Sequence, residues 1–183
     1  MESTKIIIYD CGKEPFVKAL DLTKYSKSIG DNGVEYYSPY SIAKDLLNSE
    51  QNTDFVQLYK LTHFNNAVIA LDEDGRMRGL PDNRYFYDGG HKIKLAGRFI
   101  VFPCVLDYDV AGYVMMTNQE DGQEIDKFIT RIIGSNYGDG TDERFKLSQD
   151  DSNNTRGDFQ FSEFNSFGDL MDILDKEADM LEV

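Results

Sequence analysis

The 183-residue chain contains no tryptophan and only two cysteines, two histidines and four prolines. Two cysteines, Cys11 and Cys104, are too few for the disulfide framework of a small secreted domain, and they lack metal-ligand spacing. We expect both thiols to be reduced, and Cys104 to be buried because it lies in an apolar run. The histidines, His63 and His91, stand in no recognisable catalytic context, so they do not indicate acid–base chemistry.

The sequence also lacks a long apolar run. No stretch approaches the ~20 consecutive apolar residues of a membrane span, and residues 1–6 do not begin an apolar signal-peptide core. We therefore expect a cytoplasmic protein with no membrane partner. Hydrophobic residues still make up 40% of the chain and aromatic residues 13%. That content is sufficient for a packed core, so the chain is expected to fold as one domain, with or without an appendage.

Positive charge is scarce, and its scarcity is uneven. The chain holds 33 acidic and 19 basic residues, a net charge of −14. Residues 1–110 hold 16 acidic and 13 basic residues, whereas residues 111–183 hold 17 acidic and 6 basic residues. Nucleic-acid binders neutralise phosphates with Lys and Arg, so we expect no direct nucleic-acid binding. Such a surface instead favours a basic protein partner, although acidity for solubility alone is an open alternative.

Apolar periodicity outlines the first three quarters of the chain. Ser38 and Pro39 are typical of a helix start, and Ile125 opens an apolar face that repeats at helical spacing. Pro103 lies inside the most apolar run, where it predicts an edge, a bulge or a strand end. The patterns predict strands at 4–9, 55–61, 67–71, 97–106 and 110–116, an irregular stretch at 77–84, and helices at 16–20, 38–49 and 125–133.

The last quarter differs in composition. Gly134 occupies the position that usually follows a helix, and residues 134–158 are polar and glycine-rich, which predicts a long loop. A short strand at 159–161 and a helix at 166–181 follow. The order of elements predicts an α+β fold: a mostly antiparallel sheet covered by two to four helices on one side. We expect a core domain at 1–134 and an acidic C-terminal segment at 135–183, packed on that core.

The acidic turns do not complete a metal site. Residues 72–75 and 139–143 each resemble a fragment of a calcium-binding loop. If their glycines occupy the sixth position of such a loop, Pro81 or Lys146 stands where a bidentate Glu is required. The sequence therefore predicts no metal and no cofactor, although acidic clusters can hold Mg²⁺ through one or two carboxylates.

The predicted C-terminal helix carries a row of carboxylates along one side. Helical geometry places residues three or four apart on the same side. Like charges at that spacing repel one another, and acids near a helix C-terminus oppose the helix dipole. A basic partner would remove this cost, whereas the alternative is a solvated acidic face. The candidate partner-binding residues are Asp169, Asp172, Asp175, Asp179 and Glu182.

Residues 67–101 resemble a small uncharacterised domain common in phages and plasmids. That domain has a strand, an acidic turn ending in Gly, a Gly-Leu-Pro-x-Asn-Arg segment and a closing apolar strand. The matching positions are Asp74, Gly75, Gly79, Leu80, Pro81, Asn83 and Arg84. The resemblance implies a mobile-element context and brings no known chemistry with it. As a small acidic chain of that kind, the protein is also similar in type to antirestriction and anti-CRISPR proteins.

The Gly-Leu-Pro-x-Asn-Arg segment has two physical interpretations. Gly79 permits a positive φ and Pro81 fixes the following turn. Asn83 can hydrogen-bond nearby backbone, and Arg84 can clamp a carboxylate or a phosphate. The segment is therefore either an ordered connection between strands, held by Asn and Arg, or part of a ligand site.

The sequence supports three functional hypotheses. The first is a phage or mobile-element inhibitor that binds a basic groove of a host nucleic-acid-targeting defence nuclease, a Cas9-like, nucleic-acid-guided effector foremost, in the host cytosol. The second is a metal-dependent enzyme, or a trigger of one, that causes cleavage of guide RNA or other nucleic acid. The third is an accessory protein of a mobile element. The carboxylates available to the second are Asp72, Asp74, Asp139 and Asp142.

Overall fold

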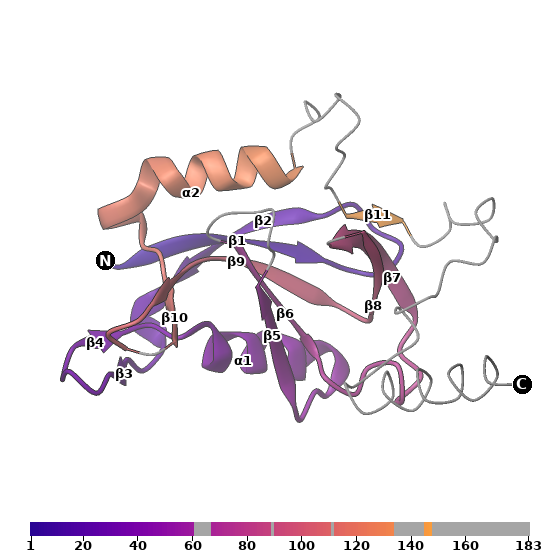
Figure 1. Ribbon diagram of the computed structural model, residues 1–183, viewed down its shortest axis with the longest axis horizontal. Coiled ribbons are helices and arrows are strands. Elements are labelled where there is room, and N and C mark those ends of the chain that lie inside the picture. Colours follow the sequence, from indigo (N-terminus) through magenta and orange to yellow (C-terminus); the bar gives the residue numbers. More distant parts are fainter. Residues whose placement is uncertain (61–66, 89, 111, 134–144, 148–183) are drawn as a thin grey trace, which may run out of the picture.

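The fold is α+β, built around a six-stranded antiparallel sheet (Figure 1). The structure, a computed structural model, describes residues 1–60, 67–88, 90–110, 112–133 and 145–147. The strands of these ranges are β1 (Ser3–Tyr9), β2 (Phe16–Asp21), β3 (Ser28–Ile29), β4 (Glu35–Tyr36), β5 (Val56–Lys60), β6 (Ala67–Asp72), β7 (Asp82–Asp88), β8 (His91–Ala96), β9 (Phe99–Asp107), β10 (Gly112–Met115) and β11 (Lys146–Leu147). The helices are α1 (Pro39–Gln51), α2 (Asn118–Ile133) and the short 3₁₀ helix η1 (Leu22–Lys24).

The main sheet has the order β2-β1-β9-β6-β5, and β10 pairs with the distal part of β9. The strand predicted at 97–106, the most apolar run, is confirmed as β9, which lies between β1 and β6. The strands predicted at 55–61 and 67–71 are present as β5 and β6, which pair antiparallel with Val56 opposite Asp72. Two smaller sheets, β11-β7-β8 and β3-β4, complete the described part of the chain.

Pro103 lies within β9, opposite Ala67 of β6, and not at an edge. The pairing of β1 with β9 extends to Val101, and the pairing of β10 begins at Cys104. The Pro103 carbonyl accepts the N–H of Met116 at 2.9 Å. Since the N–H and C=O of one strand residue point to the same neighbour, the missing N–H of Pro103 falls where β9 changes partner. The proline therefore costs no hydrogen bond of either ladder.

Helices cover both faces of the main sheet, so the prediction of one covered side is wrong. Ile6 and Ile8 of β1 pack in a cluster with Ile42 and Leu47 of α1. The alternate residue Ile7 packs in a second cluster with residues of α2, β7 and β8. Figure 1 shows α1 and α2 on opposite sides of the strands. The continuous apolar runs of β1 and β9 are the physical reason, because a strand buried on both faces does not alternate.

α1 follows its sequence signals closely. The Ser38 side chain accepts the backbone N–H of Tyr40 at 3.3 Å, and Pro39 is the first helical residue. Asn52 ends the helix with a left-handed φ of 53°, a conformation that Asn adopts more readily than most residues. The apolar residues of α1 at helical spacing, Ile42, Ala43, Leu46 and Leu47, are buried.

Three local predictions need correction. Residues 16–20 form β2 and not a helix, because six consecutive register pairs with β1 outweigh a five-residue spacing pattern. The irregular stretch at 77–84 contains the start of β7. The predicted loop at 134–158 contains β11, which pairs with Arg84 and Tyr85 of β7. Next to β11, Phe145 packs its ring against Tyr9, Phe86 and Phe99 at centroid distances of 5.0, 5.3 and 5.1 Å.

α2 begins at Asn118, earlier than the pattern from Ile125 indicated. Asp121, with φ −127° and ψ 26°, interrupts its helical backbone near the start. Its buried residues include Ile125, Phe128 and Ile132, whereas Ile133 is partly exposed. Neither α1 nor α2, the α-helices in the described ranges, is long and apolar enough to cross a bilayer. The division into 1–134 and 135–183 stays a prediction.

Candidate functional site

The Gly-Leu-Pro-x-Asn-Arg segment connects β6 to β7. Gly79 has a φ of 74°, a conformation that favours glycine. The N–H of Leu80 donates to the Gly75 carbonyl at 2.9 Å, and the N–H of Arg78 donates to the Asp74 carbonyl at 2.9 Å. These bonds fold the acidic turn back on itself, so that Leu80 and Pro81 reach the turn between β8 and β9.

Gly97 receives this connection. Its N–H donates to the Pro81 carbonyl at 2.7 Å, and its φ is 73°. A Cβ on Gly97 would lie 2.7 Å from both Gln51 Oε1 and Leu80 Cδ1. Position 97 therefore requires glycine both for its backbone conformation and for the close approach of these side chains.

Asn83 joins the two sheets. Its side-chain amide donates to the Tyr9 carbonyl at 2.9 Å and to the Gly97 carbonyl at 2.8 Å, and the residue is 2% exposed. Tyr9 ends β1 of the main sheet, while Asn83 itself belongs to β7 of the second sheet. Asn83 thus satisfies two backbone carbonyls at the point where the sheets meet.

Arg84 completes the connection from inside the protein. It is 4% exposed, and its guanidinium donates to Asn83 Oδ1 at 2.8 Å and to the Lys13 carbonyl at 2.5 Å. The guanidinium carbon also lies 5.8 Å from the centre of the Tyr9 ring. These acceptors are neutral oxygens and an aromatic face, not the carboxylate or phosphate that the sequence allowed. The structural interpretation of the segment, an ordered connection held by Asn and Arg, is confirmed.

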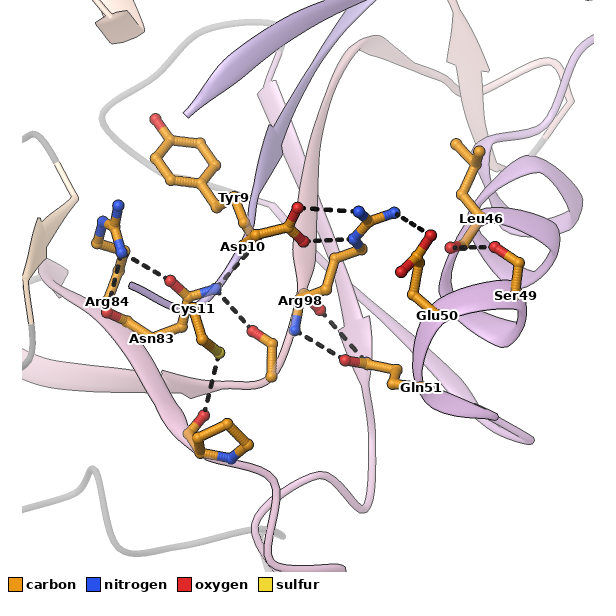
Figure 2. Close-up of polar contacts among 12 residues, drawn as sticks. Tyr9, Asp10, Cys11, Leu46, Ser49, Glu50, Gln51, Asn83, Arg84 and Arg98 are labelled. Carbon is orange, nitrogen blue, oxygen red and sulfur yellow. Dashed lines mark hydrogen bonds and ion pairs between the residues drawn. The ribbon is translucent and has the colours of Figure 1, made fainter. Parts of the chain in front are cut away.

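Asp10 and Arg98 form an ion pair between this connection and the end of α1 (Figure 2). The Arg98 guanidinium donates to the Asp10 carboxylate through Nε at 2.5 Å and through Nη2 at 2.9 Å. The hydrogen bond to Asp10 raises the pKa of Arg98 above its ordinary value. Gln51 at the end of α1 accepts the backbone N–H of Arg98 at 2.8 Å, and Glu50 lies 3.8 Å from Arg98 Nη1.

A buried carboxylate, Asp72, lies at the end of β6. Its Oδ2 accepts the Thr53 hydroxyl at 2.9 Å and also pairs with Arg78. Its Oδ1 accepts the backbone N–H of Asp74 at 2.8 Å, while Arg78 also donates to the Gln51 carbonyl at 2.7 Å. Both oxygens of Asp72 are therefore occupied by protein donors, which indicates a structural role in linking β6 to the end of α1.

Neither cysteine has the lowered pKa of an activated nucleophile. Cys11 Sγ lies 3.6 Å from the Pro81 carbonyl, and burial raises the pKa of its thiol. Cys104 is buried as predicted, and burial raises its pKa well above the ordinary value. Both are free thiols that stay protonated at neutral pH. His91 is exposed on β8, and His63 lies outside the described residues.

The structure tests only part of the predicted acidic sites. Asp72 and Asp74 share one turn, whereas Asp139 and Asp142 fall outside the described residues. Within the described ranges, no three His, Cys, Asp or Glu side chains are grouped so that they could hold a metal ion. The predicted partner-binding residues Asp169, Asp172, Asp175, Asp179 and Glu182 also lie outside the described residues.

No family model matches the chain, and no curated protein or solved structure is significantly similar to it. The resemblance of residues 67–101 to a phage and plasmid domain therefore stays a prediction. Its motif residues do share one local structure, because the turn at Asp74 and Gly75 and the bend at Gly79 lie between β6 and β7, and the Asn83–Arg84 pair lies at the start of β7.

Sequence reasoning missed Asp10, Arg98, Gln51 and Thr53 as members of this network. The Asp10–Arg98 pair spans 88 positions of the chain, and no local pattern links two such residues. One signal was available: Arg98 follows a glycine and precedes the central strand. A charged residue at that position must emerge at the end of a buried strand, where a buried or half-buried charge needs a partner.

Proposed function

We propose that the protein is a phage or mobile-element inhibitor of a host nucleic-acid-guided nuclease. The partner would be a single-protein, RNA-guided effector of the Cas9-like kind. The protein would occupy a basic groove of that nuclease with carboxylates in place of nucleic-acid phosphates. Inhibition would then result from binding, without chemistry on the part of the inhibitor.

The distribution of charge is the observation that carries this proposal. Residues 111–183 hold 17 acidic and 6 basic residues. A segment of this composition is steered toward basic grooves and repelled by phosphate backbones. α2 contributes Glu120, Glu124 and Asp126, all exposed, from the start of this region. Glu124 and Asp126 pair with Lys127 and Lys5 at 3.1 and 2.8 Å. Such exposed pairs are weak, so both carboxylates stay available to a stronger partner.

The polar network between the sheets favours binding over catalysis. Its acids and bases satisfy one another: Asp10 pairs with Arg98, Asp72 pairs with Arg78, and Asn83 with Arg84 bonds backbone carbonyls. A catalytic group needs a free polar atom and a pKa suited to proton transfer. This network instead holds the ends of β1, β6 and β7 in place.

Charge reversal tests the proposal. The triple variant Asp172→Lys, Asp175→Lys and Asp179→Lys should weaken binding to a purified, guide-loaded Cas9-type nuclease by at least about a hundredfold, since buried charge pairs at interfaces each contribute several kcal/mol. The measurement is biolayer interferometry at two salt concentrations, with circular dichroism to confirm that the fold is intact.

A matched variant controls for net charge. Glu14, Asp54 and Glu73 are exposed acids of the described core, and changing all three to Lys alters the total charge by the same amount. This variant should bind the nuclease nearly as well as the wild-type protein. If both triple variants bind the nuclease as tightly as the wild-type protein, the C-terminal carboxylates have no role in binding. If both variants bind it more weakly than the wild type and to the same degree, the carboxylates contribute only through the net charge of the protein.

A further inference from the structure

Two hairpins meet at the end of the molecule where α1 begins. The β3–β4 hairpin packs its turn against the β9–β10 hairpin, because a Cβ on Gly30 would lie only 2.7 Å from Val110 Cγ1. Val110 is 8% exposed as a result. The next residue after β4, Tyr37, accepts the backbone N–H of Met115 at 2.9 Å, which fixes the two hairpins to each other. Figure 1 shows β3, β4 and β10 at this end of the sheet.

The two hairpin tips expose large apolar side chains. Tyr108 is 86% exposed, Ile29 70%, Val34 54% and Leu106 39%. Singly exposed apolar residues are ordinary, but a group of them on adjoining turns is typical of an interaction site. We call these four residues, together with the carboxylates of the same turns, the hairpin-tip surface.

The charge of the hairpin-tip surface has one sign. Its carboxylates are Asp31, Glu35, Asp107 and Asp109, and residues 28–36 and 105–113 contain no Lys or Arg. Glu35 is the register partner of Ile29, so a carboxylate accompanies an exposed apolar side chain on that hairpin. Asp107 and Asp109 flank Tyr108 on the other hairpin. The surface therefore offers apolar contact area surrounded by negative charge.

The backbone of both tips is held by local hydrogen bonds. Asp107 Oδ1 accepts the N–H of Asp109 at 2.8 Å beneath Tyr108. Asn32 Oδ1 accepts the N–H of Val34 at 3.1 Å, and the Gly30 N–H donates to the Val34 carbonyl at 2.9 Å. A preorganised turn loses little conformational entropy on binding, so Tyr108 is presented as an anchor at low entropic cost.

We propose that the hairpin-tip surface docks a basic surface of a partner protein, one that presents Lys or Arg side chains around an apolar contact. Tyr108 would be the central anchor, since exposed tyrosines are enriched among the residues that dominate binding energy. A second copy of this chain is a poor partner, because its own four carboxylates would face the four carboxylates of the first copy and repel them. Nucleic acids and anionic lipids would be repelled for the same reason. The proposal that this surface binds a basic protein does not depend on the proposed function. Only the identification of that protein as a guided nuclease rests on the proposed function.

The chain offers a matched pair of variants. The tip variant is Tyr108→Ala with Asp109→Lys. The control variant is Phe55→Ala with Asp54→Lys, which changes an equally adjacent pair of an acid and an exposed aromatic residue; Phe55 is 60% exposed. α1, which is 13 residues long and therefore spans about 20 Å, separates the two positions. Neither Tyr108 nor Phe55 is buried, so both variants should fold normally.

The probe is a short fluorescent peptide of alternating Arg and Leu, compared with a Glu and Leu peptide, and binding is measured by fluorescence anisotropy on the full chain. The wild-type protein should prefer the Arg peptide. The tip variant should bind it about tenfold more weakly, which corresponds to the loss of one anchor residue, and the control variant should bind it nearly as well as the wild type. The same contrast should persist in the background of the C-terminal triple charge reversal.

Equal affinity of the tip and control variants for the Arg peptide would overturn the proposal. Self-association of the wild-type protein in sedimentation velocity that the tip variant alone abolishes would also overturn it, because the surface would then bind a second copy. A parallel titration with a guide-loaded Cas9-type nuclease separates the two proposals. No binding to the nuclease, together with a retained peptide contrast, would refute the proposed function and support the hairpin-tip surface.

Discussion

The Asp10 carboxylate and the Arg98 guanidinium form a two-point ion pair, with N···O distances of 2.5 and 2.9 Å, at one end of the main sheet. The pair directly adjoins the register position at which Tyr9 of β1 faces Phe99 of β9. At the end of α1, Glu50 lies 3.8 Å from the same guanidinium, and the Gln51 side chain accepts the backbone N–H of Arg98. A single side chain thus ties the two central strands to the helix that covers one face.

Removing this guanidinium should destabilise the fold. We expect Arg98→Ala to lower the free energy of unfolding by about 2 kcal/mol, less than the loss for a fully buried pair, because the two side chains keep 14% and 17% exposure. Arg98→Lys should lose about half as much, since lysine keeps the charge but not the two-point geometry. Urea denaturation measures both. Equal stability of the wild type and Arg98→Ala would contradict a structural role for the pair.

The stability of the protein should be more sensitive to substitution of Asn83 than to substitution of its exposed neighbours. Asn83→Ala leaves the carbonyls of Tyr9 and Gly97 without their donors, and we expect a loss of about 2–3 kcal/mol. Asn83→Asp should be at least as harmful because it turns an acceptor toward those carbonyls. The exposed neighbour Asp82 is the control, and Asp82→Ala should change stability by less than about 0.5 kcal/mol. A similar result for Asn83→Ala and Asp82→Ala in thermal denaturation would refute this account of the motif.

Replacing Thr4 with valine should increase the stability of the protein. Its side chain is fully buried, and its hydroxyl has no hydrogen-bond partner in the described structure. Burying an unbonded hydroxyl is unfavourable, so Thr4→Val should stabilise the protein by about 1 kcal/mol. Thr53→Val is the matched control, because the Thr53 hydroxyl donates to Asp72 at 2.9 Å, and it should destabilise the protein. Opposite signs in chemical denaturation are expected, and a loss of stability in both variants would contradict the prediction.

Tyr37 should show a characteristic dependence on alkaline pH. Its hydrogen bond with Glu2 raises the pKa of Tyr37 from 10.0 to about 12. A raised pKa means that the fold stabilises the protonated phenol, so this contribution is fully present below pH 10.0 and is lost as pH rises toward about 12. The stability difference between the wild type and Tyr37→Phe should therefore shrink over that range. In Glu2→Gln, the phenol should ionise at lower pH, as followed by tyrosinate absorbance; an unchanged titration would contradict the assignment of the hydrogen bond to Glu2.

Local chemistry made part of the fold predictable. α1 has its cap, its first-turn proline and a four-residue apolar face within one short segment, and each signal agrees with the others. The helix predicted at 16–20 was wrong because Phe16, Val17 and Leu20 form too short a run for periodicity alone to distinguish a helix from a strand. Pairing with β1 makes this segment a strand. The cover on both faces was signalled by uninterrupted apolar runs in β1 and β9, which is the pattern of strands buried on two sides.

The polar network was predictable only in part. The Gly-Leu-Pro-x-Asn-Arg segment indicated an ordered connection between strands, since glycine, proline and asparagine have position-specific roles in turns. Its partners at Tyr9, Gly97 and Lys13 come from distant strands and loops. The same holds for Asp10 with Arg98. Tertiary pairing of this kind depends on strand order, which a single sequence does not encode in any local pattern.

We propose that this acidic protein inhibits a guided nuclease by occupying its basic groove. The most direct test is a DNA-cleavage assay with purified, guide-loaded Cas9-type nuclease and increasing amounts of the full chain, in which the guide RNA is recovered and run on a denaturing gel. The account predicts that cleavage stops at a stoichiometric amount of protein while the guide RNA stays intact. Undiminished cleavage at a large excess of protein would contradict the account, and shortened guide RNA would replace inhibition by binding with the metal-dependent cleavage hypothesis.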